Sequence, residues 1–137
     1  MTPATATMTL TRDLPFPPER VWRAVSTGAL MAEWLLPNDF QPVPGHRFTF
    51  RQQPMNGWDG VIAGQVLQVE PLRRLAYSWV ALGVVTEVTL TLDPTPTGTR
   101  LTLEQSGFAE DQGRNLAGAR FGWTLFLDRL SQHLEVT

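Results

Sequence analysis

The chain opens with alternating apolar and polar residues and then meets two adjacent prolines. In residues 8–14 (MTLTRDL), three of the four positions on one face are apolar, the pattern of a β-strand. Pro17 cannot donate a hydrogen bond to a neighbouring strand, so the strand must end there. Pro18 has the φ angle of a first helical turn, and apolar residues then recur at helical spacing. The stretch PFPPERVW therefore predicts a corner from a strand into a helix that runs to about Ser26.

A second short helix is predicted directly after the first. Thr27 is a candidate N-cap for residues 28–36 (GALMAEWLL), whose large apolar side chains share one side. Pro37 ends this helix. Two short helices therefore separate the first strand from the rest of the chain.

The middle of the chain alternates apolar and polar residues in five further segments. They are separated by short turn sequences that include Asn-Gly, Asp-Gly and Pro/Gly pairs. This arrangement predicts an antiparallel meander. The expected strands are residues 47–53, 61–70, 74–81, 84–93 and 99–107.

The last segment has the apolar spacing of a long helix. From Leu116 to Leu134 an apolar residue recurs every three or four positions, and Phe121, Leu125 and Phe126 widen the apolar side. The expected fold is α+β: a six-stranded curved antiparallel sheet around a long C-terminal helix, with two short helices between strands one and two. Because a curved sheet and a helix do not fit together along their full length, a void between them is also expected.

Composition narrows the classes of function. The 137 residues suit a single domain over residues 1–137, with residues 1–7 as a disordered or extended tail. A net charge of −2 with scattered arginines predicts binding to neither nucleic acid nor membrane. The lack of cysteine excludes disulfides, thiolate catalysis and cysteine-bound metals. Because we recognise neither a signal peptide nor a membrane-spanning segment, we expect a cytoplasmic protein.

Five segments carry a resemblance to a known family. They are FPPERVWRAVSTGALMAEWLLP, PGHRFTF, DGVIAGQVLQVEPLRRLAYSW, GTRLTLEQSGF and GWTLFLDRL, which together cover the chain from about Thr9 to Leu134. On these segments the chain resembles the START-like (SRPBCC) superfamily, and within it the family of activator of heat-shock-protein-90 ATPase homologues. The resemblance implies the helix-grip fold and a hydrophobic cavity between sheet and helix. Through the family name it also implies a role in the stress response.

Few residues point to catalysis. His46 and His133 lie far apart in the sequence without ligand-like spacing, so we expect surface or capping histidines and no metal. Ser106 lacks both the G-x-S-x-G context and a histidine placed beside it. The glycines form neither a dinucleotide-binding motif nor a phosphate-binding loop. We therefore expect no catalytic residue and no cofactor.

Bulky aromatic residues are the most informative set, since a domain of this size needs few of them for its core alone. Plain core packing is the alternative for each of them. Tyr77, Arg51 and Glu104 are candidate polar groups of a cavity, although alternation places Arg51 and Glu104 opposite the apolar side chains. The candidate cavity-lining residues are Trp34, Phe40, Phe48, Phe50, Trp58, Tyr77, Trp79, Leu90, Leu101, Leu103, Phe121, Trp123 and Phe126.

Two features near the expected cavity mouth have alternative interpretations. Residues 54–58 (PMNGW) form a hairpin tip that is either a lid or a loop whose Trp58 folds back onto the core. Gly113, Gly118 and Gly122 begin the last helix, and they either allow close packing on the sheet or loosen the helix beside the mouth.

Three functions stay open from the sequence. The first is binding of a small hydrophobic or amphipathic ligand without turnover. The second is a cyclase- or dehydratase-type enzyme that uses the same cavity. The third, implied by the resemblance, is a co-chaperone that stimulates the heat-shock-protein-90 ATPase, although the chain has no counterpart of the separate N-terminal domain of the eukaryotic proteins. A homodimer through an edge strand or the two-helix face also stays open.

Overall fold

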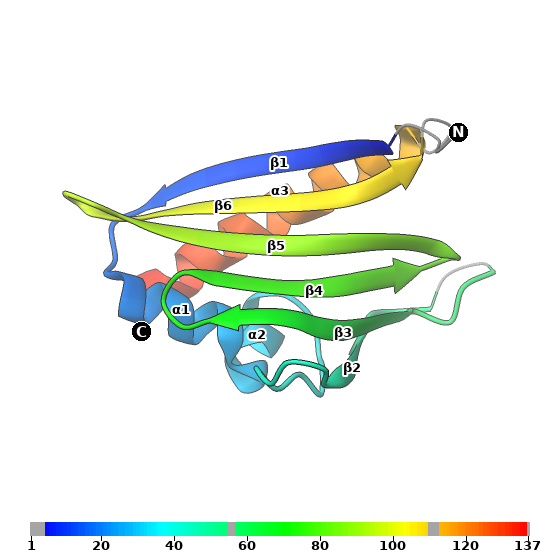
Figure 1. The fold of residues 1–137 in the computed structure, drawn as a ribbon, viewed down its shortest axis with the longest axis horizontal. Coiled ribbons are helices and arrows are strands. Elements are labelled where there is room, and N and C mark those ends of the chain that lie inside the picture. Colours follow the sequence, from blue (N-terminus) through cyan, green and yellow to red (C-terminus); the bar gives the residue numbers. More distant parts are fainter. Residues whose placement is uncertain (1–4, 55–56, 110–112, 137) are drawn as a thin grey trace.

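A computed structural model of the chain describes residues 5–54, 57–109 and 113–136. One six-stranded antiparallel sheet curves in front of a long C-terminal helix, and two short helices pack beside the C-terminal half of that helix (Figure 1). This is the predicted α+β helix-grip architecture. The strands are β1 (Thr5–Leu14), β2 (Arg47–Arg51), β3 (Val61–Glu70), β4 (Arg74–Ala81), β5 (Val84–Thr95) and β6 (Gly98–Ala109), and the helices are α1 (Pro18–Ser26), α2 (Gly28–Trp34) and α3 (Gly113–Val136).

The sheet follows chain order except at one edge. Its strand order is β1-β6-β5-β4-β3-β2, so β2 to β6 form the predicted meander and β1 pairs with the last strand. The two edge strands are β1 and β2. No helix in the described part of the chain has the combination of length and apolar character that crossing a membrane requires.

The proline corner forms as the sequence predicts. Pro17 lies in the extended region at φ −67° and ψ 154°, and Pro18 is the first residue of α1. The carbonyl of Pro17 accepts hydrogen bonds from the amides of Arg20 (3.0 Å) and Val21 (3.2 Å), which closes the first turn. Thr27 precedes α2 as predicted, but its side chain makes no capping hydrogen bond.

Several element boundaries differ from the prediction. β1 begins at Thr5 rather than at residue 8, because β6 runs on to Ala109 and supplies a partner for Thr5. Residues 5–7 of the predicted tail are therefore strand, and residues 1–4 lie outside the described residues. α2 ends at Trp34, two residues early, because Leu35 leaves helical geometry with φ −107° and ψ −93°.

The core lies between α3 and the sheet. The C-terminal half of α3 buries Trp123, Leu127, Leu130 and Leu134 at the spacing that the sequence predicts. A second part of the core is aromatic. The ring of Phe48 makes edge-to-face contacts with three other rings, and the ring centroids lie 5.0 to 5.5 Å apart. These rings belong to Phe40, Phe50 and Tyr77.

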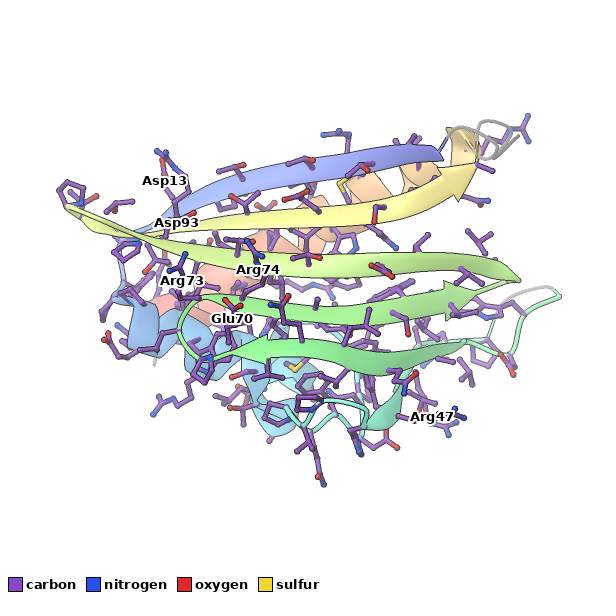
Figure 2. The ribbon with its side chains drawn as sticks, in the orientation of Figure 1. Asp13, Arg47, Glu70, Arg73, Arg74 and Asp93 are labelled. Atoms are coloured by element: carbon purple, nitrogen blue, oxygen red, sulfur yellow. The ribbon has the colours of Figure 1, made fainter. Side chains whose placement is uncertain are left out.

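Several labelled charged side chains gather at one end of the sheet. Figure 2 shows Asp13, Asp93 and Arg73 near the end where β5 turns into β6, away from the β4–β5 turn. Arg100 donates a hydrogen bond of 2.8 Å to the carboxylate of Asp13, and this bond holds the pKa of Asp13 below its usual range. Because both groups are exposed, the pair contributes little to stability.

Gly60 and Gly83 form a matched pair for testing how tightly the turns constrain the sheet. Their φ angles are +82° and +76°, a region in which any side chain costs about 1–2 kcal/mol. A Cβ at Gly60 would lie 2.1 Å from the backbone oxygen of Gln52, whereas nothing lies within 4 Å of one at Gly83. We expect Gly60→Ala to lower the free energy of unfolding by about 2 kcal/mol more than Gly83→Ala, because the backbone must move. Urea denaturation measures this difference, and equal losses would contradict it.

Candidate functional site

A pocket of about 680 Å³ opens between the sheet and the N-terminal half of α3. Its lining residues place it where β4 turns into β5. This turn is on the right in Figure 1, at the end of the sheet opposite Asp13 and Asp93 in Figure 2. The position of the pocket follows from the burial of side chains along α3. They are mostly exposed from Gly113 to Phe121 but regularly buried from Trp123 onward. The C-terminal half of α3 therefore packs closely on the core, whereas the N-terminal half packs against it only through the partly buried Leu116 and Ala119.

Three parts of the chain form the pocket wall, and most of their side chains are apolar. The ends of β4, β5 and β6 form one side, α3 forms the second, and residues before β2 and around the β2–β3 connection form the third. The lining residues are Leu36, Gln52, Trp58, Ile62, Trp79, Ala81, Leu82, Val84, Thr86, Gln105, Phe108, Asn115, Gly118, Ala119, Phe121, Gly122, Trp123, Leu125, Phe126 and Arg129.

A chain of buried hydrogen bonds crosses the wall. The indole N–H of Trp123 donates to Oε1 of Gln105 (3.0 Å), and Nε2 of Gln105 donates to Oγ1 of Thr86 (2.9 Å). The hydroxyl of Thr86 donates in turn to the backbone oxygen of Trp79 (2.8 Å). Because an indole can only donate and a carbonyl can only accept, the direction of every bond in the chain is fixed. Gln105 and Thr86 are each only 2% exposed.

Gln105 and Thr86 were missed as candidate residues, although the sequence contains a signal for both. Gln105 continues the alternation of Leu101 and Leu103 along β6, and Thr86 continues that of Val88 along β5. Both polar side chains therefore had to share the face that the leucines bury. The candidate Glu104 lies between Leu103 and Gln105 on β6, faces the opposite side of the sheet and is exposed, as the alternation indicates.

The candidate lining residues divide into two groups. Five of them line the pocket: Trp58, Trp79, Phe121, Trp123 and Phe126. The others are buried in the core and are not part of the pocket wall: Trp34, Phe40, Phe48, Phe50, Tyr77, Leu90, Leu101 and Leu103. Which residues contact a ligand stays a prediction for both groups.

Tyr77 lies in the aromatic core rather than at the pocket. Its side chain is fully buried, and its hydroxyl has no hydrogen-bond partner in the described part of the chain. Burial in an apolar environment disfavours the phenolate and raises the pKa of Tyr77 well above its ordinary value of 10.0. Arg51, the third candidate polar group, is exposed at the end of β2.

The two histidines make separate local contacts. Nε2 of His46 lies 3.0 Å from the backbone oxygen of Asp39, and Nδ1 of His133 lies 3.1 Å from a carboxylate oxygen of Glu33 on α2. The side chain of His133 is only 9% exposed, so it joins α3 to α2 instead of standing free at the helix end. Among the described residues, no three histidine, aspartate or glutamate side chains are grouped closely enough to hold a metal ion.

The two features predicted near the mouth both touch the pocket. Trp58 folds back, is partly buried and donates from its indole nitrogen to the backbone oxygen of Val61 (3.2 Å), and its ring lines the pocket. Residues 55 and 56 of the same hairpin tip lie outside the described residues. Gly118 and Gly122 also line the pocket, and a Cβ at either would meet nothing within 4 Å. Close packing on the sheet, one interpretation of these glycines, is therefore wrong.

Three of the large apolar side chains that line the pocket are exposed to solvent. Phe121 is 70% exposed and Leu125 is 44% exposed. At about 100° per residue, both lie on the side of α3 roughly opposite the buried Trp123, so the prediction that they widen the core-facing side is wrong. Leu82 on the β4–β5 turn and Leu125 on α3 are exposed lining residues as well. Arg129 is also exposed, and its guanidinium carbon lies 5.8 Å from the centroid of the Phe126 ring.

A curved antiparallel sheet that holds one long helix, with two short helices after the first strand, defines the class of START-like, helix-grip proteins. The model of one family within this class, described as activator of Hsp90 ATPase homolog 1-like protein, matches residues 15–135. The chain belongs to this family. No functionally curated protein is significantly similar to the chain.

Solved structures support the same assignment. Protein MLL2253 from Mesorhizobium loti is 43% identical to the chain, with a TM-score of 0.90 over 96% of this chain and 98% of the other. DynU16, from the dynemicin biosynthetic locus, is 27% identical with a TM-score of 0.81, and the match spans 94% of this chain but 47% of DynU16. CalU16 from Micromonospora echinospora is 27% identical, with a TM-score of 0.75 over 95% of this chain and 75% of CalU16.

Proposed function

We propose that this protein binds a small hydrophobic or amphipathic ligand in the pocket between α3 and the ends of β4, β5 and β6. The observation that carries the proposal is the pocket itself. Its volume of about 680 Å³ falls within the range of roughly 300–1,000 Å³ that is usual for small-molecule sites. Its wall is mainly apolar and contains the buried series of hydrogen bonds from Trp123 to Trp79. Such a wall holds a ligand by burying its apolar surface and orients it by hydrogen bonds.

The polar groups of the wall favour binding over proton transfer. Arg129 is the one ionisable side chain that the described residues contribute to the lining, and a guanidinium offers donors only. The remaining polar side chains are amides and a hydroxyl, which orient a ligand by hydrogen bonds. The cyclase- or dehydratase-type alternative therefore lacks an acid–base pair among these groups, and the co-chaperone alternative rests on the family name alone. A fold shared with DynU16, a protein in a biosynthetic locus, is compatible with a small-molecule ligand.

The proposal is tested with Nile red, a neutral hydrophobic dye, and a pair of variants on neighbouring positions of α3. Gly118 lines the pocket and Ala117 does not, while both are exposed helix positions. We expect wild-type protein and Ala117→Leu to bind the dye equally. Gly118→Leu should bind it at least about tenfold more weakly, since a leucine side chain there occupies the pocket.

Fluorescence titration measures these affinities, and native mass spectrometry of the same samples gives the stoichiometry and the mass of any ligand that copurifies. Equal dye affinity in both leucine variants would place the dye elsewhere on the protein and overturn the proposal. Because leucine is a good helix former, loss of binding in Gly118→Leu does not reflect a weakened helix.

A further inference from the structure

The amide of Gln105 has hydrogen-bonding capacity that the protein does not use. A primary amide has two N–H donors and two acceptor lone pairs. Trp123 occupies one acceptor position and Thr86 receives one N–H, and no further partner of this side chain exists among the described residues. One N–H and one lone pair therefore stay free on a side chain that is 2% exposed and lines the pocket.

The side-chain amide of Gln105 cannot flip by 180° to exchange the positions of its oxygen and nitrogen. The indole of Trp123 needs an acceptor, so Oε1 must face it. Thr86 gives its own proton to the backbone oxygen of Trp79, so it needs a donor, which only Nε2 supplies. The free N–H and the free lone pair are thus held in fixed positions, and a ligand that meets them loses little additional conformational freedom.

The surroundings of Gln105 favour an uncharged partner. Trp79, Thr86 and Trp123, its neighbours in the chain of hydrogen bonds, carry no formal charge. A ligand carboxylate placed there would lose its hydration without a counter-charge, which is costly in a buried site. Arg129 is the one charged lining residue, and it is solvent-exposed near Phe126, where water screens it.

We propose that the pocket prefers neutral hydrophobic molecules that carry a carbonyl group, and that Gln105 is the residue that donates a hydrogen bond to this carbonyl. A hydroxyl next to the carbonyl can use the free lone pair on Oε1. This inference rests on the proposed binding function and adds the chemical class of the ligand.

Two naphthalene probes of nearly equal shape test the inference: methyl naphthyl ketone and isopropylnaphthalene, which differ by a carbonyl oxygen in place of a methyl group. Quenching of tryptophan fluorescence measures their affinities for wild-type protein, for Gln105→Leu and for the pocket-blocking Gly118→Leu. We expect the affinity for the ketone to fall about tenfold in Gln105→Leu, while the affinity for the hydrocarbon is unchanged or rises. Both probes should bind poorly to Gly118→Leu.

Gln105→Leu leaves the indole of Trp123 without its acceptor and can weaken the fold. A second measurement therefore uses wild-type protein alone. The infrared carbonyl stretch of an isotope-labelled ketone bound to wild-type protein should lie below its value in an alkane solvent, as a hydrogen-bonded carbonyl does. If both probes bind and Gly118→Leu blocks them, but the stretch keeps its alkane value and the ketone preference survives in Gln105→Leu, the inference is overturned and the binding function stands. If neither probe binds to wild-type protein, the proposed function fails and the inference with it.

Discussion

Replacement of Tyr77 by phenylalanine is expected to raise the free energy of unfolding by about 1–2 kcal/mol. The hydroxyl of Tyr77 is buried and unpartnered among the described residues, so folding removes it from water without a compensating bond. Thr86→Val is the matched control, because the Thr86 hydroxyl is also buried but both donates and accepts. Its removal should lower stability by about 1–2 kcal/mol. Urea denaturation of the two variants should give shifts of opposite sign, and a loss of stability in Tyr77→Phe would show that its hydroxyl has a partner.

The same tyrosine predicts how stability depends on alkaline pH. The folded state raises the pKa of Tyr77 above the ordinary value of 10.0, so the unfolded chain loses this proton first. The free energy of unfolding therefore does not depend on this ionisation below about pH 10, and it falls by about 1.4 kcal/mol for each pH unit above it. The assignment is unusually clear, because the chain has one tyrosine, no cysteine and no lysine, and its 11 arginines stay charged at this pH.

Two measurements check the alkaline prediction. Unfolding free energies of wild-type protein should decline from about pH 10 to pH 11, and those of Tyr77→Phe should stay nearly level over this interval. The absorbance of tyrosinate should appear together with unfolding rather than before it. Tyrosinate that forms gradually in folded protein near pH 10 would mean that water or a partner reaches the hydroxyl.

The fold could be predicted from the sequence because its signals are local. The two prolines place a strand end next to a helix start, and the alternation in each strand determines which side chains face the core. The exact ends of elements depend on contacts that are distant in the sequence. Thr5 is part of β1 only because β6 continues as far as Ala109 to pair with it.

The site could be predicted only in part, because alternation identifies a face and not the neighbours that each side chain meets on that face. Tyr77 and Trp79 are two residues apart on the same side of β4, yet Tyr77 is packed in the core and Trp79 lines the pocket. Nothing within β4 distinguishes them. The difference arises from the rings around each side chain. Tyr77 packs against Phe40, Phe48 and Phe50, in β2 and the segment before it. Trp79 lies beside Trp123 of α3 at the pocket wall. Gln105 was predictable, since a polar residue in the apolar register of a strand must be bonded within the core.

The glycines of α3 lead to the second large effect, which combines a gain in stability with a loss of binding. Gly118 and Gly122 are interior helix positions, and alanine there is favoured over glycine by about 1 kcal/mol each. A Cβ at either position meets no atom within 4 Å, so no clash offsets this gain. We expect Gly118→Ala/Gly122→Ala to raise the free energy of unfolding by up to about 2 kcal/mol. Affinity for Nile red should fall severalfold, because both methyl groups enter the pocket.

The reverse change on the same helix separates the two effects. Ala117 is exposed and outside the pocket lining, so Ala117→Gly should lower the free energy of unfolding by about 1 kcal/mol and leave the dye affinity unchanged. Urea denaturation and dye titration on all three proteins complete the comparison. A stabilised double variant that binds the dye normally would mean that the glycines do not serve the pocket. A double variant with weaker binding would show that α3 gives up helix stability to keep the pocket open, as expected where function competes with stability.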